Sequence, residues 1–198
     1  MLRTHQLAPK FKALRLGGML DTLELRLQEA QQAKSGYLEF LESLLEDEIS
    51  RRDNKALALR VQRAHFDRVC TLAEFDFSYN PKIPAPQIRD LARGGYITAN
   101  QSIIICGPVG VGKSHVAQAL GHAACQQGHS VLYTKTNRLL SDLSGGHADG
   151  TFDTRLRRYL QPDLVICDLS RSRDYPDAVP GSPWRPCSGA EDRIWMSG

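Results

Sequence analysis

The sequence predicts an α/β protein in which an all-helical N-terminal domain precedes a parallel sheet with flanking helices. In the N-terminal part of the chain, apolar residues recur at three- and four-residue steps, which is the period of amphipathic helices. After residue 99, short β-branched apolar runs alternate with helical patterns, as in βαβ units. These patterns divide the chain into a helical domain (1–70), a linker with an entry helix (71–98), an α/β core (99–169) and an irregular tail (170–198).

Composition limits the class of protein. The chain has 198 residues and a formal net charge of +3, so a nucleic-acid partner has to be sought in local basic segments. No apolar run approaches the about 18 residues of a membrane span, and the N-terminus lacks the apolar core of a secretory signal. Five cysteines without C-x-x-C spacing suit a reducing cytoplasm, and Cys106 and Cys167 are expected as small core residues of strands.

The N-terminal domain is predicted as two helical stretches. The first covers 4–32 with a break near Gly17 and Gly18, and the second begins at Ser35, which can serve as its N-cap. Acidic residues come early in the second stretch and basic residues follow from Arg51 onward, an order that suits the helix dipole.

The basic part of the second stretch is a candidate DNA-binding surface. Its predicted contacts are Arg51, Arg52, Lys55, Arg60 and Arg63. Such a helix can lay its cations along a phosphate backbone, and it can equally be a solvated amphipathic face. No base-reading pattern accompanies the cations, so DNA contact is expected to be largely independent of base sequence.

The α/β core is predicted to begin with a strand and a phosphate-binding loop. Isoleucines at 103–105 are typical of a buried parallel strand, and the following GPVGVGKS fits the Walker A pattern G-x-x-x-x-G-K-[ST]. The glycines let backbone N–H groups converge on phosphate oxygens at the start of the next helix. Lys113 would reach the β- and γ-phosphates, and Ser114 would bind Mg²⁺. The predicted nucleotide-binding residues are Gly107, Pro108, Val109, Gly110, Val111, Gly112, Lys113, Ser114 and His115.

The rest of the core continues the alternation of strands and helices. We expect a strand at 130–135, a helix at 136–143, a flexible loop at 144–150 with an exposed His147, a helix with basic residues at 151–160, and a strand at 163–168. The last strand, LVICD, ends in Asp168 at the edge where ligands collect in open α/β sheets. This pattern is typical of a Walker B strand, whose acid would hold Mg²⁺.

Together these segments resemble the IstB-like transposition helper ATPases, relatives of the DnaC-type helicase loaders within the AAA+ group. The resemblance extends over roughly residues 5–168 and is most specific in FDFSYNPKI, in GPVGVGKSHVAQALGHAACQQGHSVLY and in RLRRYLQPDLVICD. It implies a P-loop NTPase fold with ATP and Mg²⁺ as cofactors. It also implies a helical domain that engages DNA or transposase, and ATPase domains that assemble side by side around DNA.

The sequence departs from the family after Asp168. The family places a second acid there to polarise the attacking water, whereas this chain has Leu169. The tail is dense in Pro, Ser, Gly and Arg, a composition for disorder, and contains no recognisable sensor residue or arginine finger. We therefore expect an incomplete sheet with an unpaired apolar edge and hydrolysis near background. We also expect a divergence of the reading frame or chain near 168–170, as in a decayed mobile element; a divergent but functional tail is the alternative.

Three functions remain open on the sequence. The first is an ATP-binding helper of DNA transposition, with DNA and transposase as partners, self-assembly into a homo-oligomer and no membrane. The second is a DnaC-like loader of a replicative helicase, which shares the ATPase half. The third is a non-enzymatic DNA- or partner-binding module with a relic ATPase half. A small-molecule kinase is disfavoured because no lid or acceptor site is recognisable.

Overall fold

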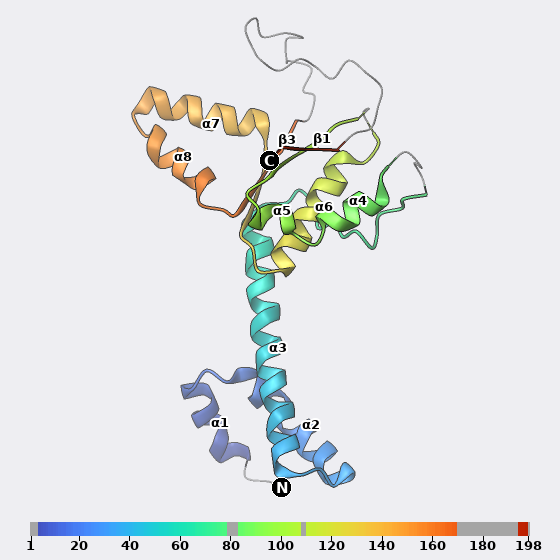
Figure 1. Ribbon diagram of the computed structural model, residues 1–198. Helices are drawn as coiled ribbons and strands as arrows, with labels where there is room; N and C mark the ends of the chain where they lie inside the picture. Colours follow the sequence, from blue (N-terminus) through green and yellow to red (C-terminus); the bar gives the residue numbers. More distant parts are fainter. Residues whose placement is uncertain (1–3, 79–82, 108–109, 170–193, 198) are drawn as a thin grey trace, which may run out of the picture. The chain divides into compact units, whose positions relative to one another are not determined.

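The computed structural model describes residues 4–78, 83–107, 110–169 and 194–197 (Figure 1). The chain divides into two compact units, Met1–Leu59 and Arg60–Gly198. Within the described ranges, no helix combines the length and the apolar character that crossing a membrane requires.

The first unit is built from α1 (Thr4–Ala13), α2 (Gly17–Ala33) and the first part of α3 (Tyr37–Ala64). The predicted break is confirmed: it falls just before α2, where Arg15 takes a left-handed backbone conformation with φ 57°. The unit has its own core of buried residues, Met19, Leu23 and Leu44, against which partly buried apolar side chains pack.

The start of α3 differs by a small step from the expectation. The helix begins at Tyr37, so Gly36 rather than Ser35 precedes its first turn. The carboxylate of Glu39 accepts the backbone N–H of Gly36 at 3.1 Å, which satisfies a donor at the helix start. The cap is therefore supplied by the acid in the first turn and not by the serine.

A buried carboxylate joins α2 to α3 inside the first unit. Glu48 is 4% exposed; its Oε2 accepts the Gly18 N–H at 2.6 Å, and its Oε1 accepts the Arg52 Nε–H at 2.7 Å. A Cβ at Gly18 would lie 2.9 Å from the Glu48 Cα, so this approach requires glycine. Burial alone would raise the pKa of Glu48, but Arg52, the Gly18 amide and Arg51 together lower it to about 2.

The second unit contains the remaining elements of the described chain. They are α4 (Ala85–Leu91), α5 (Gly95–Thr98), β1 (Ser102–Ile105), α6 (Lys113–Gln126), β2 (Val131–Lys135), α7 (Thr136–Asp149), α8 (Phe152–Leu160), β3 (Leu164–Asp168) and β4 (Ile194–Ser197). Helices α4, α5 and α6 contribute the buried core residues, which are Ile88, Leu91, Tyr96, Val116 and Leu120. Partly buried apolar residues of β1 pack against the same core.

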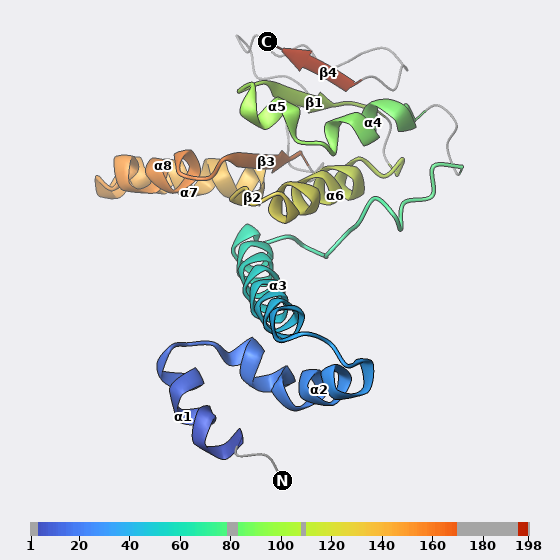
Figure 2. The ribbon, with the colours of Figure 1, turned by 60° about the horizontal axis from the view of Figure 1, so that its bottom comes forward.

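The described strands form two ladders of two strands each. β2 and β3 pair in parallel, from Val131↔Leu164 to Lys135↔Asp168, whereas β1 pairs antiparallel with β4 (Figure 2). The predicted α/β class with a short parallel sheet is confirmed, but β1 does not join the parallel ladder as we expected. In the part of the chain that the structure describes, no strand bridges β1 and β3, so they cannot share a ladder. Apart from β4, the predicted irregular tail lies outside the described residues.

The burial of the strands reflects how small these ladders are. Four of the five positions of β2 are buried, but none of those of β3 is, and Ile104 of β1 is 40% exposed. Cys167, which we expected in the core, is exposed. A strand with a ladder partner on one edge alone covers less of its neighbours, and this agrees with the expected incomplete sheet.

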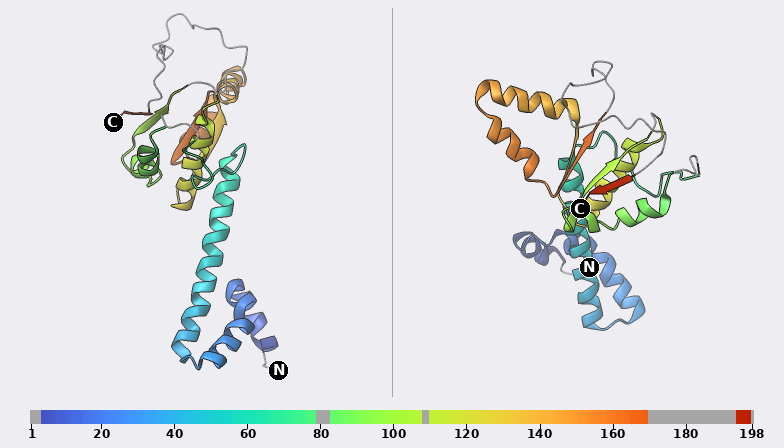
Figure 3. Two further views of the ribbon diagram at one scale, coloured as in Figure 1. Left: turned by 90° about the vertical axis from the view of Figure 1, so that its right-hand side faces the viewer. Right: turned by 45° about the horizontal axis from the view of Figure 1, so that its top comes forward.

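One segment predicted as a flexible loop is helical. Residues 144–149 of the expected loop form the last part of α7, and Gly150, which has φ 72°, is the C-cap residue that follows the helix. Gly146 is buried, and a Cβ there would lie 2.9 Å from the Phe152 Cα, so this glycine serves the close packing of α7 on α8 (Figure 3). His147 is exposed as expected and stacks on the Phe152 ring, with 4.0 Å between the ring centroids.

Candidate functional site

The glycine-rich loop ends at the first turn of α6. Gly110 and Gly112 have φ values of 88° and 94°, left-handed conformations that residues with a Cβ rarely adopt. The Gly112 carbonyl accepts the Val116 N–H at 2.9 Å, which is the first hydrogen bond of the helix. The N–H groups of a first helical turn lack acceptors within their helix and lie at the positive end of its dipole. This arrangement suits the binding of phosphate oxygens.

The backbone bend at residues 110–112 is called the glycine bend below. The other predicted nucleotide-binding residues that the structure describes lie in it or next to it. Pro108 and Val109 lie outside the described residues, Gly107 precedes them, and Val111 lies between Gly110 and Gly112. Lys113 and Ser114 occupy the first turn of α6 and are half-buried. The Ser114 carbonyl accepts a hydrogen bond from the side chain of Gln118 at 3.2 Å, so its first turn is held from within the helix.

An aromatic cluster that sequence reasoning assigned to the linker covers the same bend. Phe75 packs edge-on against Phe77, with ring centroids 4.8 Å apart, and its centroid lies 5.2 Å from that of His115. A Cβ at Gly112 would lie 3.0 Å from the Phe75 ring. The Nε2 atom of His115 is buried and has no hydrogen-bond partner among the described residues. The FDF segment was the only signal of this cluster in the sequence.

Asp168 ends β3, and its carboxylate is held by a tyrosine of the neighbouring strand. The Tyr133 hydroxyl donates to Asp168 Oδ2 at 2.7 Å, and Asp67 Oδ2 lies 3.4 Å from the same hydroxyl. Burial and the Asp168 carboxylate raise the pKa of Tyr133. Lys135 forms an ion pair with Asp67 at 3.4 Å. The predicted Walker B acid is therefore oriented by β2, a contact that the sequence did not indicate.

The glycine bend and Asp168 belong to the same unit and are connected through α6. A Cβ at Gly121 would lie 2.7 Å from the Ile166 Cδ1, which shows that α6 packs closely on β3 at this glycine. No hydrogen bond joins Ser114 to Asp168 within the described residues. The two predicted Mg²⁺ ligands thus stand on neighbouring elements without a direct bond.

The predicted DNA-binding residues of α3 fall into two groups. Arg51 and Arg52 contact the buried Glu48 carboxylate, at 3.4 and 2.7 Å, and Arg60 Nε donates to the Cys125 carbonyl at 2.9 Å. The side chains of Lys55 and Arg63 are exposed and form no ion pair within the described chain. Three of the five cations therefore already have partners inside the protein. The two contacts to Glu48 have the i,i+3 and i,i+4 spacing of helical ion pairs, which the sequence could have shown, whereas the contact of Arg60 joins distant segments.

Comparisons with known proteins agree with this site. The sequence pattern of the family described as IstB-like ATP binding protein matches residues 9–175. A protein described as an ATP-binding protein of an insertion sequence in Mycobacterium tuberculosis is 48% identical over 83% of this chain and 65% of its own length. The insertion sequence IS1162 ATP-binding protein of Pseudomonas fluorescens is 36% identical over 85% and 73%. That of insertion sequence IS21 in Pseudomonas aeruginosa is 30% identical over 83% and 62%.

The chain spans about two thirds of the length of these curated relatives. The family match covers α1 from residue 9 onward, α2, α3, the aromatic cluster, the glycine bend and Asp168. The geometry at the start of α6 fits the nucleotide binding that the family description names. The chain therefore belongs to the family of IstB-like ATP-binding proteins.

Proposed function

We propose that this chain acts as an ATP-binding helper of DNA transposition. The observation that carries the proposal is the bend before α6, where Gly110 and Gly112 adopt left-handed conformations at the N-terminus of the helix, a place that suits phosphate binding. The relatives are described as ATP-binding proteins of insertion sequences, which supports transposition as the process.

ATP would place its phosphates against residues 107–114, with the Lys113 ammonium at the β- and γ-phosphates. Beside the bend, the Phe75 ring offers an apolar face and His115 Nε2 offers one unused polar atom. Ligand sites commonly combine apolar walls with a few polar atoms that fix orientation. We therefore assign the base or ribose of the nucleotide to the neighbourhood of Phe75 and His115.

Mg²⁺ would be held by the Ser114 hydroxyl, the Asp168 carboxylate and the phosphate oxygens of the nucleotide. Hydroxyl and carboxylate oxygens are the ligands that this ion prefers, so the residues fit it. The bound ion would neutralise phosphate charge. Tyr133 bonds one oxygen of Asp168 at 2.7 Å and so fixes the carboxylate while the other oxygen stays available for the ion.

Binding of ATP need not imply turnover. The position after Asp168 is Leu169, whose side chain is apolar and 73% exposed. It cannot polarise a water for attack on the γ-phosphate. We propose that hydrolysis by this chain is near background and that its nucleotide acts as a bound effector.

DNA contact is proposed for the basic part of α3, with Lys55 and Arg63 as its first contacts. Their side chains have no ion pair to give up within the described residues, whereas Arg51, Arg52 and Arg60 would each have to leave a partner. Such contacts neutralise phosphates without reading bases. A transposase partner, self-assembly and a cytoplasmic location belong to the same proposal.

A second candidate function is a non-enzymatic binding module. The first unit has its own core around Met19, Leu23 and Leu44, so binding by its helices does not depend on nucleotide chemistry. A helicase loader is the other alternative, and a pull-down with transposase against a hexameric helicase separates it from the transposition helper.

Two reciprocal variants of the full chain test the proposed function. Lys113→Ala should abolish binding of a fluorescent ATP analogue and leave the affinity for a random-sequence DNA duplex unchanged. The double variant Lys55→Ala with Arg63→Ala should weaken the DNA binding and leave ATP binding unchanged. A folded protein that takes up no ATP analogue, or that loses both activities with either variant, would contradict the proposal.

A further inference from the structure

A cavity in the Arg60–Gly198 unit lies apart from the glycine bend. It has a volume of about 390 Å³ and is lined by residues of β2, α7 and α8 together with His65. None of the predicted nucleotide-binding residues lines it. β2 contributes the buried Leu132 and Tyr133, so the cavity reaches the edge of the parallel ladder.

The described residues that line this cavity carry more positive than negative charge. Arg138 comes from α7 and Arg158 from α8, and neither forms an ion pair with a described carboxylate. Arg155 is a third cation in the lining, and Asp142 is the one acid there. The balance leaves two arginines without a countercharge, on two different helices that face one space.

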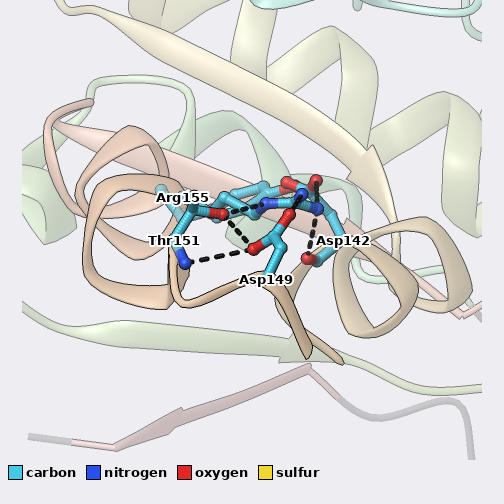
Figure 4. Close-up of polar contacts among 5 residues, drawn as sticks. Asp142, Asp149, Thr151 and Arg155 are labelled. Carbon is cyan, nitrogen blue, oxygen red and sulfur yellow. Dashed lines mark hydrogen bonds and ion pairs between the residues drawn. The ribbon is translucent and has the colours of Figure 1, made fainter. Parts of the chain in front are cut away.

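The acid does not compete for these two arginines, because its bonds are already made. Asp142 accepts Arg155 Nη1 at 3.1 Å through Oδ1 and the Tyr159 hydroxyl at 2.9 Å through Oδ2. Arg155 also bonds Asp149 and the Thr151 hydroxyl, as Figure 4 shows. This cluster ties α8 to α7 and holds the walls of the cavity in place without using Arg138 or Arg158.

We propose that the cavity binds a terminal phosphate group between the guanidinium groups of Arg138 and Arg158. Guanidinium presents paired N–H donors that match the oxygens of phosphate, and two of them balance the dianion. The hydroxyl of Ser141 also lines the space and can donate to a third oxygen. Walls from three elements suit the end of a ligand better than a continuous chain passing over a flat surface.

This phosphate could come from a free pyrophosphate or nucleotide, or from the phosphorylated end of a nucleic-acid strand. The chemistry recognised is the same in both cases. The proposal does not depend on the glycine bend, so it is tested in the full chain carrying Lys113→Ala, which removes the ammonium group of that bend and weakens phosphate binding there.

Pyrophosphate is titrated into this variant by calorimetry. We expect saturable binding to one site, weakened about tenfold or more by Arg158→Ala or by Arg138→Ala, because each removes a charge-assisted pair of hydrogen bonds. Arg157→Ala is the matched control: it removes the same charge one residue away, and Arg157 does not line the cavity. Circular dichroism verifies that each variant is folded, which is expected since Arg138, Arg157 and Arg158 are exposed.

Competition by short oligonucleotides identifies the source of the phosphate. Displacement of pyrophosphate by a 5′-phosphorylated strand, and not by its 5′-hydroxyl counterpart, assigns the cavity to strand ends. Pyrophosphate binding that neither strand displaces assigns it to small phosphorylated molecules. The proposal is overturned if pyrophosphate does not bind, if both strands displace it equally, or if Arg157→Ala weakens binding as much as Arg158→Ala.

Discussion

Gly110 and Gly112 allow two demands of the glycine bend to be measured separately, namely the left-handed backbone conformation and the close contact with the Phe75 ring. Both have a positive φ, 88° and 94°. Among the described residues, a Cβ at Gly110 would meet no atom within 4 Å, whereas a Cβ at Gly112 would lie 3.0 Å from Phe75 Cε2 and 3.3 Å from its Cζ. Gly110→Ala therefore carries the conformational cost alone, and Gly112→Ala adds the cost of moving the ring.

The expected magnitudes follow from these two terms. An L-residue in the left-handed region costs about 1–2 kcal/mol, so Gly110→Ala should lower the free energy of unfolding by that amount. The added contact resembles overpacking, which costs about 1–3 kcal/mol, so Gly112→Ala should lose about 2–5 kcal/mol in total. Urea unfolding of the full chain without nucleotide measures both values.

A third variant tests whether the Phe75 ring causes the difference. In the Gly112→Ala background, Phe75→Leu should recover most of the excess over Gly110→Ala, and a double-mutant cycle with Phe75→Leu alone corrects for the lost packing. Equal destabilisation by the two alanine variants, or a cycle with no coupling between Gly112 and Phe75, would refute the idea that the aromatic cluster presses on the bend.

Three further predictions concern the buried acid, the helix clamp and turnover. The pKa of Glu48 is lowered from 4.5 to about 2 in the folded chain, so its contribution to stability is complete above about pH 4.5 and is lost as the pH falls toward 2. Glu48→Gln should therefore flatten that part of the plot of urea midpoint against pH. An unchanged slope would contradict this prediction. Arg155→Ala should speed amide hydrogen exchange in α7 and α8 by roughly fivefold or more, because it removes about 1 kcal/mol of hydrogen bonding between α8 and Asp142 of α7. Arg157→Ala should not change the exchange rates. Equal rates in the two variants would refute a stabilising role for the Arg155 contacts. Phosphate release from ATP should remain at the background of the Lys113→Ala variant, and turnover that this variant abolishes would disprove the proposal that the chain binds without hydrolysing.

The sequence predicted the parts of this fold that local patterns determine. The break before α2, the strand at β1, the helix that follows the glycine-rich loop and the acid at the end of β3 all agree with apolar periodicity and glycine placement. These features depend on residues close together in the chain. For example, the loop has glycine at the two positions before α6 that take a left-handed backbone conformation, Gly110 and Gly112.

The features that sequence reasoning missed depend on contacts between distant segments. The length of α7 follows from the packing of Gly146 on Phe152, although a glycine pair in isolation is typical of a loop. The pairing of β1 with β4 joins segments nearly a hundred positions apart along the chain, so no local pattern could indicate it. The Phe75 ring belongs to the site because it packs on Gly112. The sequence showed only that an aromatic segment precedes the core.

The hydrogen bond from Arg60 to the Cys125 carbonyl has a consequence for the two proposed ligands. Cys125 lies in the last turn of α6, the helix whose first turn follows the glycine bend, so the guanidinium neutralises the negative end of that dipole. Arg60 cannot contact a DNA strand and keep this hydrogen bond at the same time, although the Gly128 N–H also donates to the Cys125 carbonyl, at 3.2 Å. DNA that bound Arg60 would therefore remove the charge that neutralises the C-terminal end of α6, the helix whose N-terminus is the proposed phosphate site. A nucleotide and a DNA strand would then act on opposite ends of one helix dipole.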